Sequence, residues 1–329
     1  MQRWLRWWFF PVLILCGSGC DEEIRMVLPG DPVPVVYGVF DATDTVHAVK
    51  LTKSFAGESD VYEMSKQSDL VFYQDPVIFL SAPGVSNRAY FTRISDVPRE
   101  PGDFPVLPNE YYSLTRKLNP GNYQLTILLN GLLDTLTARF SVIGELKVLQ
   151  PRYGLKRFYF YEDPTLFSWE RHSGAGLYDI SFSLTYQEYL KSGAFSTRIL
   201  THSRQLKPES LEQEGEHLNY RYFSEPFFAY IASQVKRDNE VDYRKAVNLE
   251  IQITAADTTL SRYIDWYEME IDDRINPNGN IPGAIGVIGS KYTVCFPGLA
   301  LSGRSQDSLV RGRYTANLEF VANSEWQSP

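Results

Sequence analysis

The strongest constraint on the fold lies in residues 118–143, LNPGNYQLTILLNGLLDTLTARFSVI, where apolar and polar residues alternate on both sides of an Asn-Gly pair. A period of two places successive side chains on opposite faces of a β-strand. Asn-Gly is a preferred dipeptide in the tight turn of a hairpin. The segment therefore predicts two antiparallel strands with one buried face and one wet face. The apolar set is Tyr123, Leu125, Ile127, Leu129, Leu136, Ala138, Phe140 and Val142.

Similar short runs occur through most of the chain and predict a mainly β protein. VVYGVF and VHAVKLTKSF precede the hairpin, and the spacing of these runs favours an antiparallel sandwich over residues 31–147. LQPRYG, residues 149–154, is typical of a linker. Residues 148–329 resume the pattern in GLYDISFSLTYQEYL and in AVNLEIQITAA, where Val247, Leu249, Ile251 and Ile253 are expected to point inward. They are predicted to form a second β-rich domain.

Two helices are expected to interrupt the second domain, near residues 225–238 and 258–271. Ser224 can cap the first of them, and Asp257 can cap the second, because both residue types accept a hydrogen bond from a backbone N–H of the first turn. Apolar residues recur at helical spacing in both segments, so each helix is expected to bury one face. These residues are Phe228, Ile231, Val235, Leu260, Tyr263, Ile264 and Tyr267.

Residues 1–19 have the layout of a secretory signal peptide, with Arg3 and Arg6 before an apolar run that is too short to span a bilayer. Ser18-Gly19-Cys20 resembles the end of a bacterial lipoprotein signal, in which the cysteine is acylated. This interpretation makes Cys20 the lipid attachment site and residues 20–30 a lipidated tether. The alternative is an ordinary secretory signal that ends beside a cysteine by chance.

Three carboxylates, Asp21, Glu22 and Glu23, follow Cys20 directly. They resemble the surface-export signal of lipoproteins in Bacteroidota-type cell envelopes, and a solvated tether explains them equally well. Stable anchoring needs more than one acyl chain, which a multiply acylated cysteine provides. We therefore expect a protein held in the outer membrane by its lipid and facing the cell exterior.

The net charge argues against nucleic acid as a partner, and the few cysteines argue against an internal disulfide. The chain has a net charge of −8, and removal of Arg3 and Arg6 with the signal leaves −10, so no electrostatic footprint for nucleic acid remains. Cys16 leaves with the signal and Cys20 is acylated, so no internal disulfide is expected. Cys295 alternates with apolar neighbours, and we expect it to be a small buried residue and not a nucleophile.

Sequence motifs for catalysis or metal binding are lacking. Neither G-x-S-x-G nor H-E-x-x-H occurs, and the four histidines, His47, His172, His202 and His217, show no metal-ligand spacing. We therefore predict no cofactor. Residues 270–280 gather the oxygen-bearing side chains Asp272, Asp273, Asn276 and Asn278, which are ligand types for Ca²⁺. Their spacing departs from the usual calcium loop, and we favour a Pro-Asn-Gly turn instead.

The aromatic residues raise the possibility of a sugar-binding surface, and the acidic residues that of a glycosidase. Aromatic residues make up 14% of the chain, which fits either a sugar-binding platform or an aromatic-rich β core, and we favour the core. Candidates for exposed rings are Tyr111, Tyr112, Tyr159 and Trp169. Glu162, Asp163, Glu170 and Glu188 are candidates for the paired carboxylates of a glycosidase.

Several segments in order, from Cys20 through VVYGVF, VKLTKSF, LNPGNYQLTILL and DTTLSRYIDW to NGNIPGAIGVIGSKYT, resemble a family of surface lipoproteins, the domain of unknown function 4249. The resemblance covers nearly the whole mature chain. It implies an immunoglobulin-like or prealbumin-like N-terminal β-sandwich and an outer-membrane location, often with nutrient-uptake receptors. It implies no catalytic residue.

Together these observations predict a lipid-anchored surface protein that is not an enzyme. We expect it to bind a ligand or dock to a receptor as an accessory to nutrient uptake. Its partners would be the membrane through the anchor and an outer-membrane receptor, a glycan or a peptide. Two alternatives stay open, a carboxylate-dependent glycan or peptide hydrolase and a passive structural module of the envelope.

Overall fold

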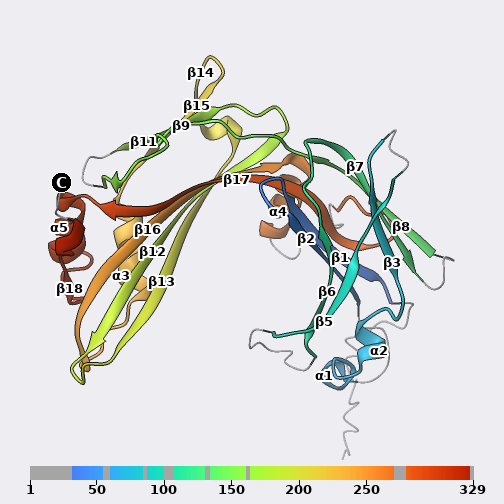
Figure 1. Ribbon diagram of the computed structural model, residues 1–329, viewed down its shortest axis with the longest axis horizontal. Helices are drawn as coiled ribbons and strands as arrows, with labels where there is room; N and C mark the ends of the chain where they lie inside the picture. The colour runs from blue at the N-terminus through green and yellow to red at the C-terminus, as the bar shows by residue number, and fades with distance from the viewer. Residues whose placement is uncertain are drawn as a thin grey trace, which may run out of the picture.

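The protein is mainly β, as the sequence predicts, with 52% strand and 17% helix. A computed structural model describes residues 32–54, 60–83, 87–99, 107–129, 134–160, 164–269 and 279–326. Figure 1 shows two β-rich halves that diverge from the long strand β17 (Ile285–Leu301) at the crown of an arch. Two separate hydrophobic cores correspond to these halves.

The N-terminal half is a two-layer sandwich. Apolar side chains from both sheets, such as Phe40 and Phe140, stack between the layers at a ring-centroid distance of 4.8 Å. Two short helices, α1 and α2, lie at one end of this half (Figure 1). The first layer contains β1 (Pro34–Asp41), β2 (Val46–Lys53), β6 (Asn109–Thr115) and β5 (Thr92–Val97), and the second contains β4 (Ala89–Tyr90), β3 (Val77–Ser81), β7 (Gly121–Leu129) and β8 (Asp134–Val142); the helices are α1 (Val61–Met64) and α2 (Ser68–Val71).

The predicted hairpin is confirmed in β7 and β8. The two strands pair antiparallel, with Tyr123 opposite Phe140 and Ile127 opposite Leu136. The alternate residues of each strand enter the N-terminal core, and the residues between them face away from it. The Asn-Gly pair lies outside the described residues.

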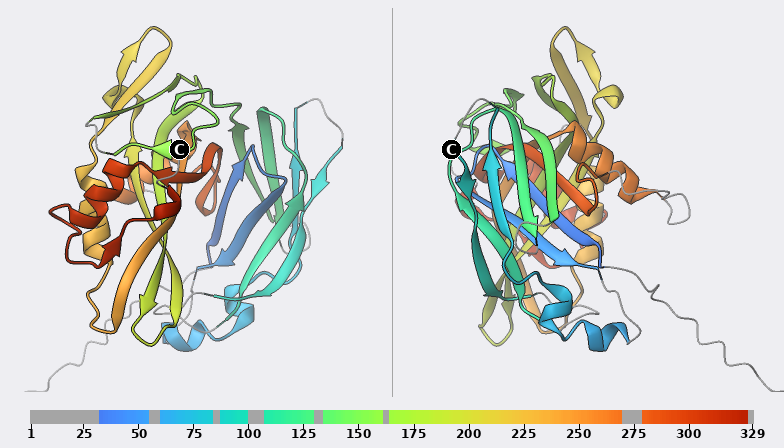
Figure 2. Two further views of the ribbon diagram at one scale, coloured as in Figure 1. Left: turned by 60° about the vertical axis from the view of Figure 1, so that its left-hand side comes forward. Right: turned by 90° about the vertical axis from the view of Figure 1, so that its right-hand side faces the viewer.

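The C-terminal half packs a large sheet against a smaller one, and the main core lies between them. Trp169, Tyr178 and Phe182 are fully buried in it. α3 (Glu225–Gln234) covers this core from one side, and Figure 2 shows α5 (Gly303–Arg311) near the C-terminal end of the chain. The large sheet contains β13 (Phe195–Leu206), β12 (Ala175–Leu190), β16 (Val241–Asp257) and β17, and the small one contains β14 (Glu212–Glu214), β15 (His217–Tyr222), β11 (Thr165–Glu170) and β9 (Val148–Gln150).

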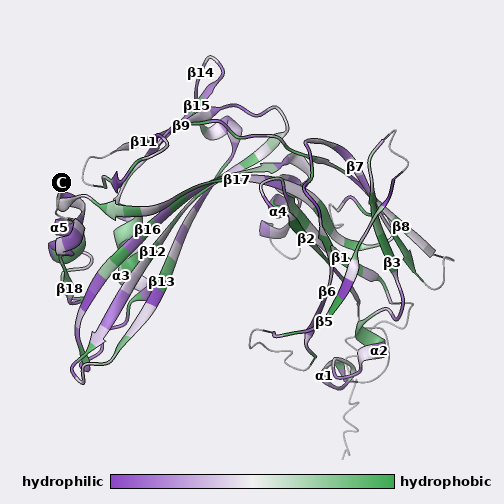
Figure 3. Ribbon diagram, in the orientation of Figure 1, coloured by the Kyte–Doolittle hydropathy of each residue, from purple (hydrophilic) through white to green (hydrophobic). Residues whose placement is uncertain are grey.

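Alternating hydropathy along β12 and β16 explains why these strands form one sheet with one buried face (Figure 3). Ile180 and Phe182 of β12 pair with Ile253 and Ile251 of β16, and all four side chains are buried. Val247 is an exception to the predicted inward set. The pairing register shifts between Thr185 and Tyr186 of β12, so Val247 falls in a β-bulge and is half-buried.

β17 joins the two halves into one ten-stranded sheet. Its first part pairs parallel with β1, and its later part pairs antiparallel with β16. Ile288 enters the N-terminal core and Val294 enters the C-terminal core, both from the same face of the strand. Gly286 has a φ of +116°, and a Cβ there would lie 1.9 Å from the carbonyl oxygen of Val36, so this pairing requires glycine. The sheet is continuous across the predicted boundary at residue 148.

Both predicted helices are present. α4 (Thr258–Glu268) begins after Asp257, which caps it as expected. α3 (Glu225–Gln234) ends four residues before the predicted limit, and Ser224 makes no side-chain capping bond because its backbone is already helical. A third helix in this half, α5 (Gly303–Arg311), was not predicted. Within the described ranges, no helix is long and apolar enough to cross a membrane.

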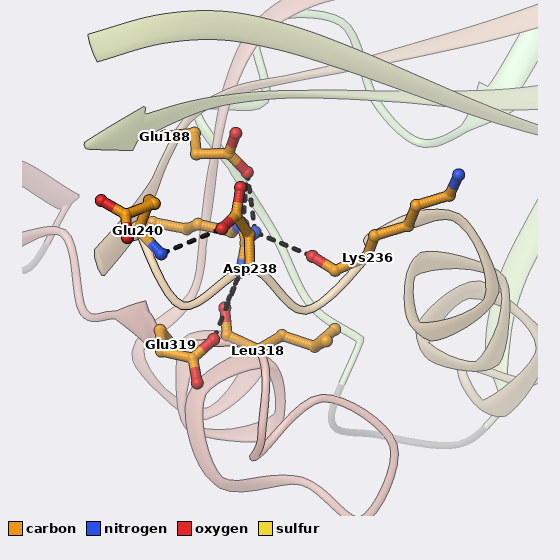
Figure 4. A network of polar contacts seen from close by, with 7 residues as sticks. Glu188, Lys236, Asp238, Glu240, Leu318 and Glu319 are labelled. Carbon is orange, nitrogen blue, oxygen red and sulfur yellow. Dashed lines mark hydrogen bonds and ion pairs between the residues drawn. The ribbon is translucent and has the colours of Figure 1, made fainter. Parts of the chain in front are cut away.

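A buried arginine fixes the last part of the chain to β16 (Figure 4). Arg244 is 1% exposed and donates to the carbonyl oxygens of Leu318 and Lys236 at 2.8 and 3.0 Å. Its guanidinium also pairs with Glu188 at 2.7 Å and with Glu319 at 3.3 Å. The network explains how one cation can be buried, because its charge is neutralised and its donors are satisfied.

Candidate ligand-binding site

A cavity of about 690 Å³ lies where the β7–β8 hairpin meets the N-terminus of α4. The end of β3 and the turn at Gly174 complete its wall. This volume is within the range of pockets that hold small organic ligands. The lining residues are Ser81, Ala82, Pro83, Asn122, Tyr123, Gln124, Arg139, Phe140, Ser141, Gly174, Asp257, Thr258 and Thr259.

The hairpin supplies most of the polar groups. Asn122 is opposite Ser141 and Gln124 is opposite Arg139, on the face of the sheet that points away from the core. The Ser141 hydroxyl donates to Asn122 Oδ1 at 2.6 Å, and Arg139 Nε donates to Gln124 Oε1 at 3.4 Å. Cross-strand hydrogen bonds thus hold these side chains in place. Arg139 is exposed and brings a guanidinium to the cavity.

Asp257 is a structural carboxylate in the cavity wall. It is 3% exposed, its Oδ1 accepts from the Leu260 backbone N–H at 2.7 Å, and its Oδ2 accepts from the Ser290 backbone N–H. Burial raises the pKa of Asp257, although these hydrogen bonds to the carboxylate act in the opposite direction. Capping α4 and binding β17 occupy both of its oxygens.

Ser290 continues this connection into the hairpin. Its hydroxyl donates to the Ser141 carbonyl oxygen at 2.6 Å and accepts from the Ile143 backbone N–H at 3.1 Å. The serine is fully buried, so these bonds are shielded from water. α4, β17 and β8 are therefore tied together around the cavity, which is a preformed feature of the fold.

None of the described residues that line this cavity was proposed as a site from the sequence. Cys20, the acidic residues Asp21, Glu22 and Glu23, and the calcium candidates Asp272, Asp273, Asn276 and Asn278 all lie outside the described residues. Within the described ranges, no three His, Cys, Asp or Glu residues are grouped to hold a metal. The sequence placed the cavity residues Gln124 and Arg139 only on the wet face of the hairpin. Their alternation with apolar residues was the one sequence feature that indicated their exposure.

The prediction that Cys295 is buried is wrong. Cys295 is exposed on β17, not buried, because its side chain is on the face of the sheet opposite the core residues Val294 and Phe296. Partial desolvation and the nearby carboxylate of Glu250 raise the pKa of the thiol to about 11. The thiol is therefore protonated at neutral pH and is a poor nucleophile despite its exposure.

Two of the four candidates for exposed aromatic rings are buried. Trp169 and Tyr112 are buried in the two cores and cannot offer a ring to a ligand, whereas Tyr159 is 45% exposed. Tyr111 is half-buried. Core packing accounts for the buried rings, as expected for aromatic residues on strands.

The candidate carboxylate pairs are engaged elsewhere. Glu188 is bound to Arg244 at the end of β12, and Glu170 pairs with Lys147 at 3.0 Å on β11 in the other sheet. Glu162 and Asp163 lie outside the described residues. The described carboxylates among these candidates are therefore ion-pair partners of separate cations.

Comparisons with known proteins do not assign a family. No family model matches the chain, and no curated protein matches it. Among solved structures, the C-terminal globular domain of an oligosaccharyltransferase from Pyrococcus abyssi has a TM-score of 0.23 and 8% identity, over 66% of this chain and 42% of that chain. CBD12 from CALX1.2 has a TM-score of 0.17 and 8% identity, over 79% and 98%. The BSP domain of a biofilm-associated protein has a TM-score of 0.13 and 6% identity, over 84% and 61%.

Proposed function

We propose that the protein is a lipid-anchored surface protein of the outer membrane that binds a polar ligand without catalysing a reaction. Ser18-Gly19-Cys20 and the acidic residues after it support the anchor and its outward orientation. The cavity beside α4 is the observation that carries the binding role. In this account the body presents its ligand to an uptake receptor in the same membrane.

The lining of the cavity supports a ligand rich in hydrogen-bonding groups, such as a glycan or a peptide. Asn122 and Gln124 offer amides that both donate and accept, and the nearby hydroxyls do the same. Half-buried Tyr123 adds apolar surface, and Arg139 can donate to a carboxylate or hydroxyl of the ligand. A few convergent polar groups on an apolar wall are typical of a binding pocket.

Hydrolysis by paired carboxylates receives less support from the same lining. A glycosidase places two carboxyl groups roughly 5–9 Å apart across its substrate. Among the described residues that line the cavity, Asp257 is the one carboxylate, and hydrogen bonds to Leu260 and Ser290 engage both its oxygens. A binding role needs only the amide, hydroxyl and guanidinium groups that line the cavity.

Binding can be tested on the chain from residue 20 onward with Cys20→Ser, which prevents acylation. The protein would be screened against glycan and peptide arrays, and hits would be measured by calorimetry. Gln124→Ala and Arg139→Ala should each lower the affinity for a ligand of this cavity by about tenfold. This is the loss expected when one hydrogen bond to a charged or polar group is removed. Arg198→Ala, an exposed arginine on β13, is the matched control.

Two results would contradict the proposal. A ligand whose affinity is the same in the cavity variants and in the control would place binding elsewhere. A screen with no hit, together with native purifications that always yield the protein alone, would favour the passive structural module.

A further inference from the structure

A second, smaller cavity of about 200 Å³ lies at the end of the N-terminal sandwich that carries α1 and α2. Three cationic side chains line it, Lys50 and Lys53 from β2 and Arg99 after β5. Thr52, Ser65 and Asn109 add polar groups to the same wall. The volume is below the roughly 300–1,000 Å³ of pockets for larger organic ligands, so the cavity suits a compact group. We call it the basic pocket.

Neutral neighbours hold the two lysines of the basic pocket. Lys50 Nζ donates to Asn109 Oδ1 at 3.1 Å, and Lys53 Nζ donates to the backbone carbonyl oxygen of Asp69 at 2.8 Å. Lys53 also lies 4.9 Å from the centre of the Tyr73 ring. Each ammonium group has three donors, so these bonds orient the lysines and leave donors for a ligand.

The positive charge of the basic pocket is not balanced by an acidic partner in the described part of the chain. No ion pair joins Lys50, Lys53 or Arg99 to a described carboxylate. Burial lowers the pKa of Lys50, and the positive charge of Arg99 lowers it further. Two cations that repel each other beside a cavity are stabilised by an anion between them. The pocket concentrates positive charge in a chain whose net charge is −8.

The pocket also lies where the chain leaves its N-terminal segment. Pro34, the first residue of β1, is opposite Lys53 in the sheet, and the Ser54 backbone N–H donates to the Val33 carbonyl oxygen at 2.8 Å. Pro32 is twelve positions after Cys20 in the sequence, and a chain of that length spans at most about 40 Å when fully extended. An acyl anchor at Cys20 would therefore keep the basic pocket near the membrane surface.

We propose that the basic pocket binds a phosphate-type oxyanion, and that a lipid headgroup of the membrane holding the anchor supplies it. Lys50, Lys53 and Arg99 would surround the oxyanion with charge-assisted hydrogen bonds, and Asn109 would hold Lys50 in position. Binding there would orient the body on the membrane, so that the sandwich end with α1 and α2 faces the lipid. The inference of a lipid source rests on the anchor proposed above, and the oxyanion site itself does not.

The test uses the chain from residue 20 with Cys20→Ser, so that acylation cannot contribute. Calorimetry at an ionic strength of about 0.15 M, where the Debye length is about 8 Å, measures binding of inorganic phosphate. Co-sedimentation at the same ionic strength measures binding to phosphatidylcholine vesicles with and without phosphatidic acid. Arg99→Gln and the double variant Lys50→Gln/Arg99→Gln should weaken both interactions, the double variant by about tenfold or more. Arg99 is exposed, so its single substitution leaves the fold intact.

The matched control is Arg152→Gln/Lys156→Gln, which also removes one arginine and one lysine, from exposed positions in the C-terminal half outside the pocket. It should stay within about twofold of the parent, because long-range charge is screened by salt. Equal weakening in the control and in the pocket variant, or no phosphate binding by the parent, would overturn the site. Phosphate binding without any dependence on phosphatidic acid would overturn the lipid source and assign a soluble oxyanion. Neither result depends on whether Cys20 is acylated in the cell.

Discussion

Asp257 connects the N-terminus of α4 to β17 by accepting the backbone N–H groups of Leu260 and Ser290 with its two carboxylate oxygens. Loss of a helix cap costs about 0.5–2 kcal/mol, and an unsatisfied buried N–H costs about 1–3 kcal/mol. Asp257→Ala should therefore lower the free energy of unfolding by about 2–4 kcal/mol in urea denaturation. Asp257→Asn keeps the side-chain shape and one acceptor oxygen, and should lose less. A loss below about 0.5 kcal/mol for the alanine variant would contradict this role.

Asp179 should make stability depend on pH. Burial raises the pKa of this half-buried carboxyl on β12, and the charge of Lys291 offsets only part of the effect. The folded state therefore binds the proton more tightly than the unfolded state, and the carboxylate destabilises the fold increasingly as pH rises above the unfolded value of 3.8.

Asp179→Asn removes this penalty, so its advantage over the parent should be greatest near pH 7. The advantage should shrink as pH falls through the raised pKa and vanish below 3.8, where the carboxyl is protonated in both states. Thermal unfolding across pH 3–8 measures it, with the exposed Asp242→Asn as control. An advantage that is independent of pH would show that ionisation of Asp179 is not its cause.

Arg244 should be among the residues most sensitive to substitution. Arg244→Met leaves Glu188 without its partner and removes the donors to the carbonyl oxygens of Leu318 and Lys236. Breaking a buried ion pair from one side costs about 3–5 kcal/mol, and we expect a loss of this size in urea denaturation. The exposed Arg198→Met should change stability by less than about 0.5 kcal/mol. Equal effects of the two substitutions would contradict the network.

Cys295 should react slowly with thiol reagents although it is exposed. In the chain with Cys20→Ser it is the sole thiol from residue 20 onward, so the rate of disulfide exchange reports on it alone. Its pKa of about 11, against an ordinary 9.0, implies a thiolate fraction near pH 8 that is about a hundredfold lower. Glu250→Gln removes a neighbouring negative charge and should speed the reaction. A rate that levels off between pH 8 and 9 would contradict the raised pKa.

The local features of the fold could be predicted from the sequence. Alternation in β7, β8 and β12 identified their buried faces, because one side of each strand enters a core and the other does not. Asp257 was recognisable as a helix cap, since its residue type precedes an apolar helical stripe. These signals depend only on neighbouring residues.

Long-range relationships could not be predicted in the same way. The parallel pairing of β1 with β17 joins segments about 250 residues apart, and only Gly286, which sits against Val36, marks the contact. The cavity unites the hairpin with α4 through Ser290 of β17, which bonds to both, so its residues carry no common sequence motif. Cys295 was placed on the wrong face because a strand of alternating Val, Cys and Phe does not reveal which side its sheet buries.

The most direct test of the functional account is mass spectrometry of the N-terminal peptide from protein purified out of its native membranes. The account predicts a chain that begins at Cys20, with the sulfur and the amino group carrying fatty acyl groups and with the protein in the outer-membrane fraction. A chain with a free thiol at Cys20, recovered in the fraction without membranes, would contradict it.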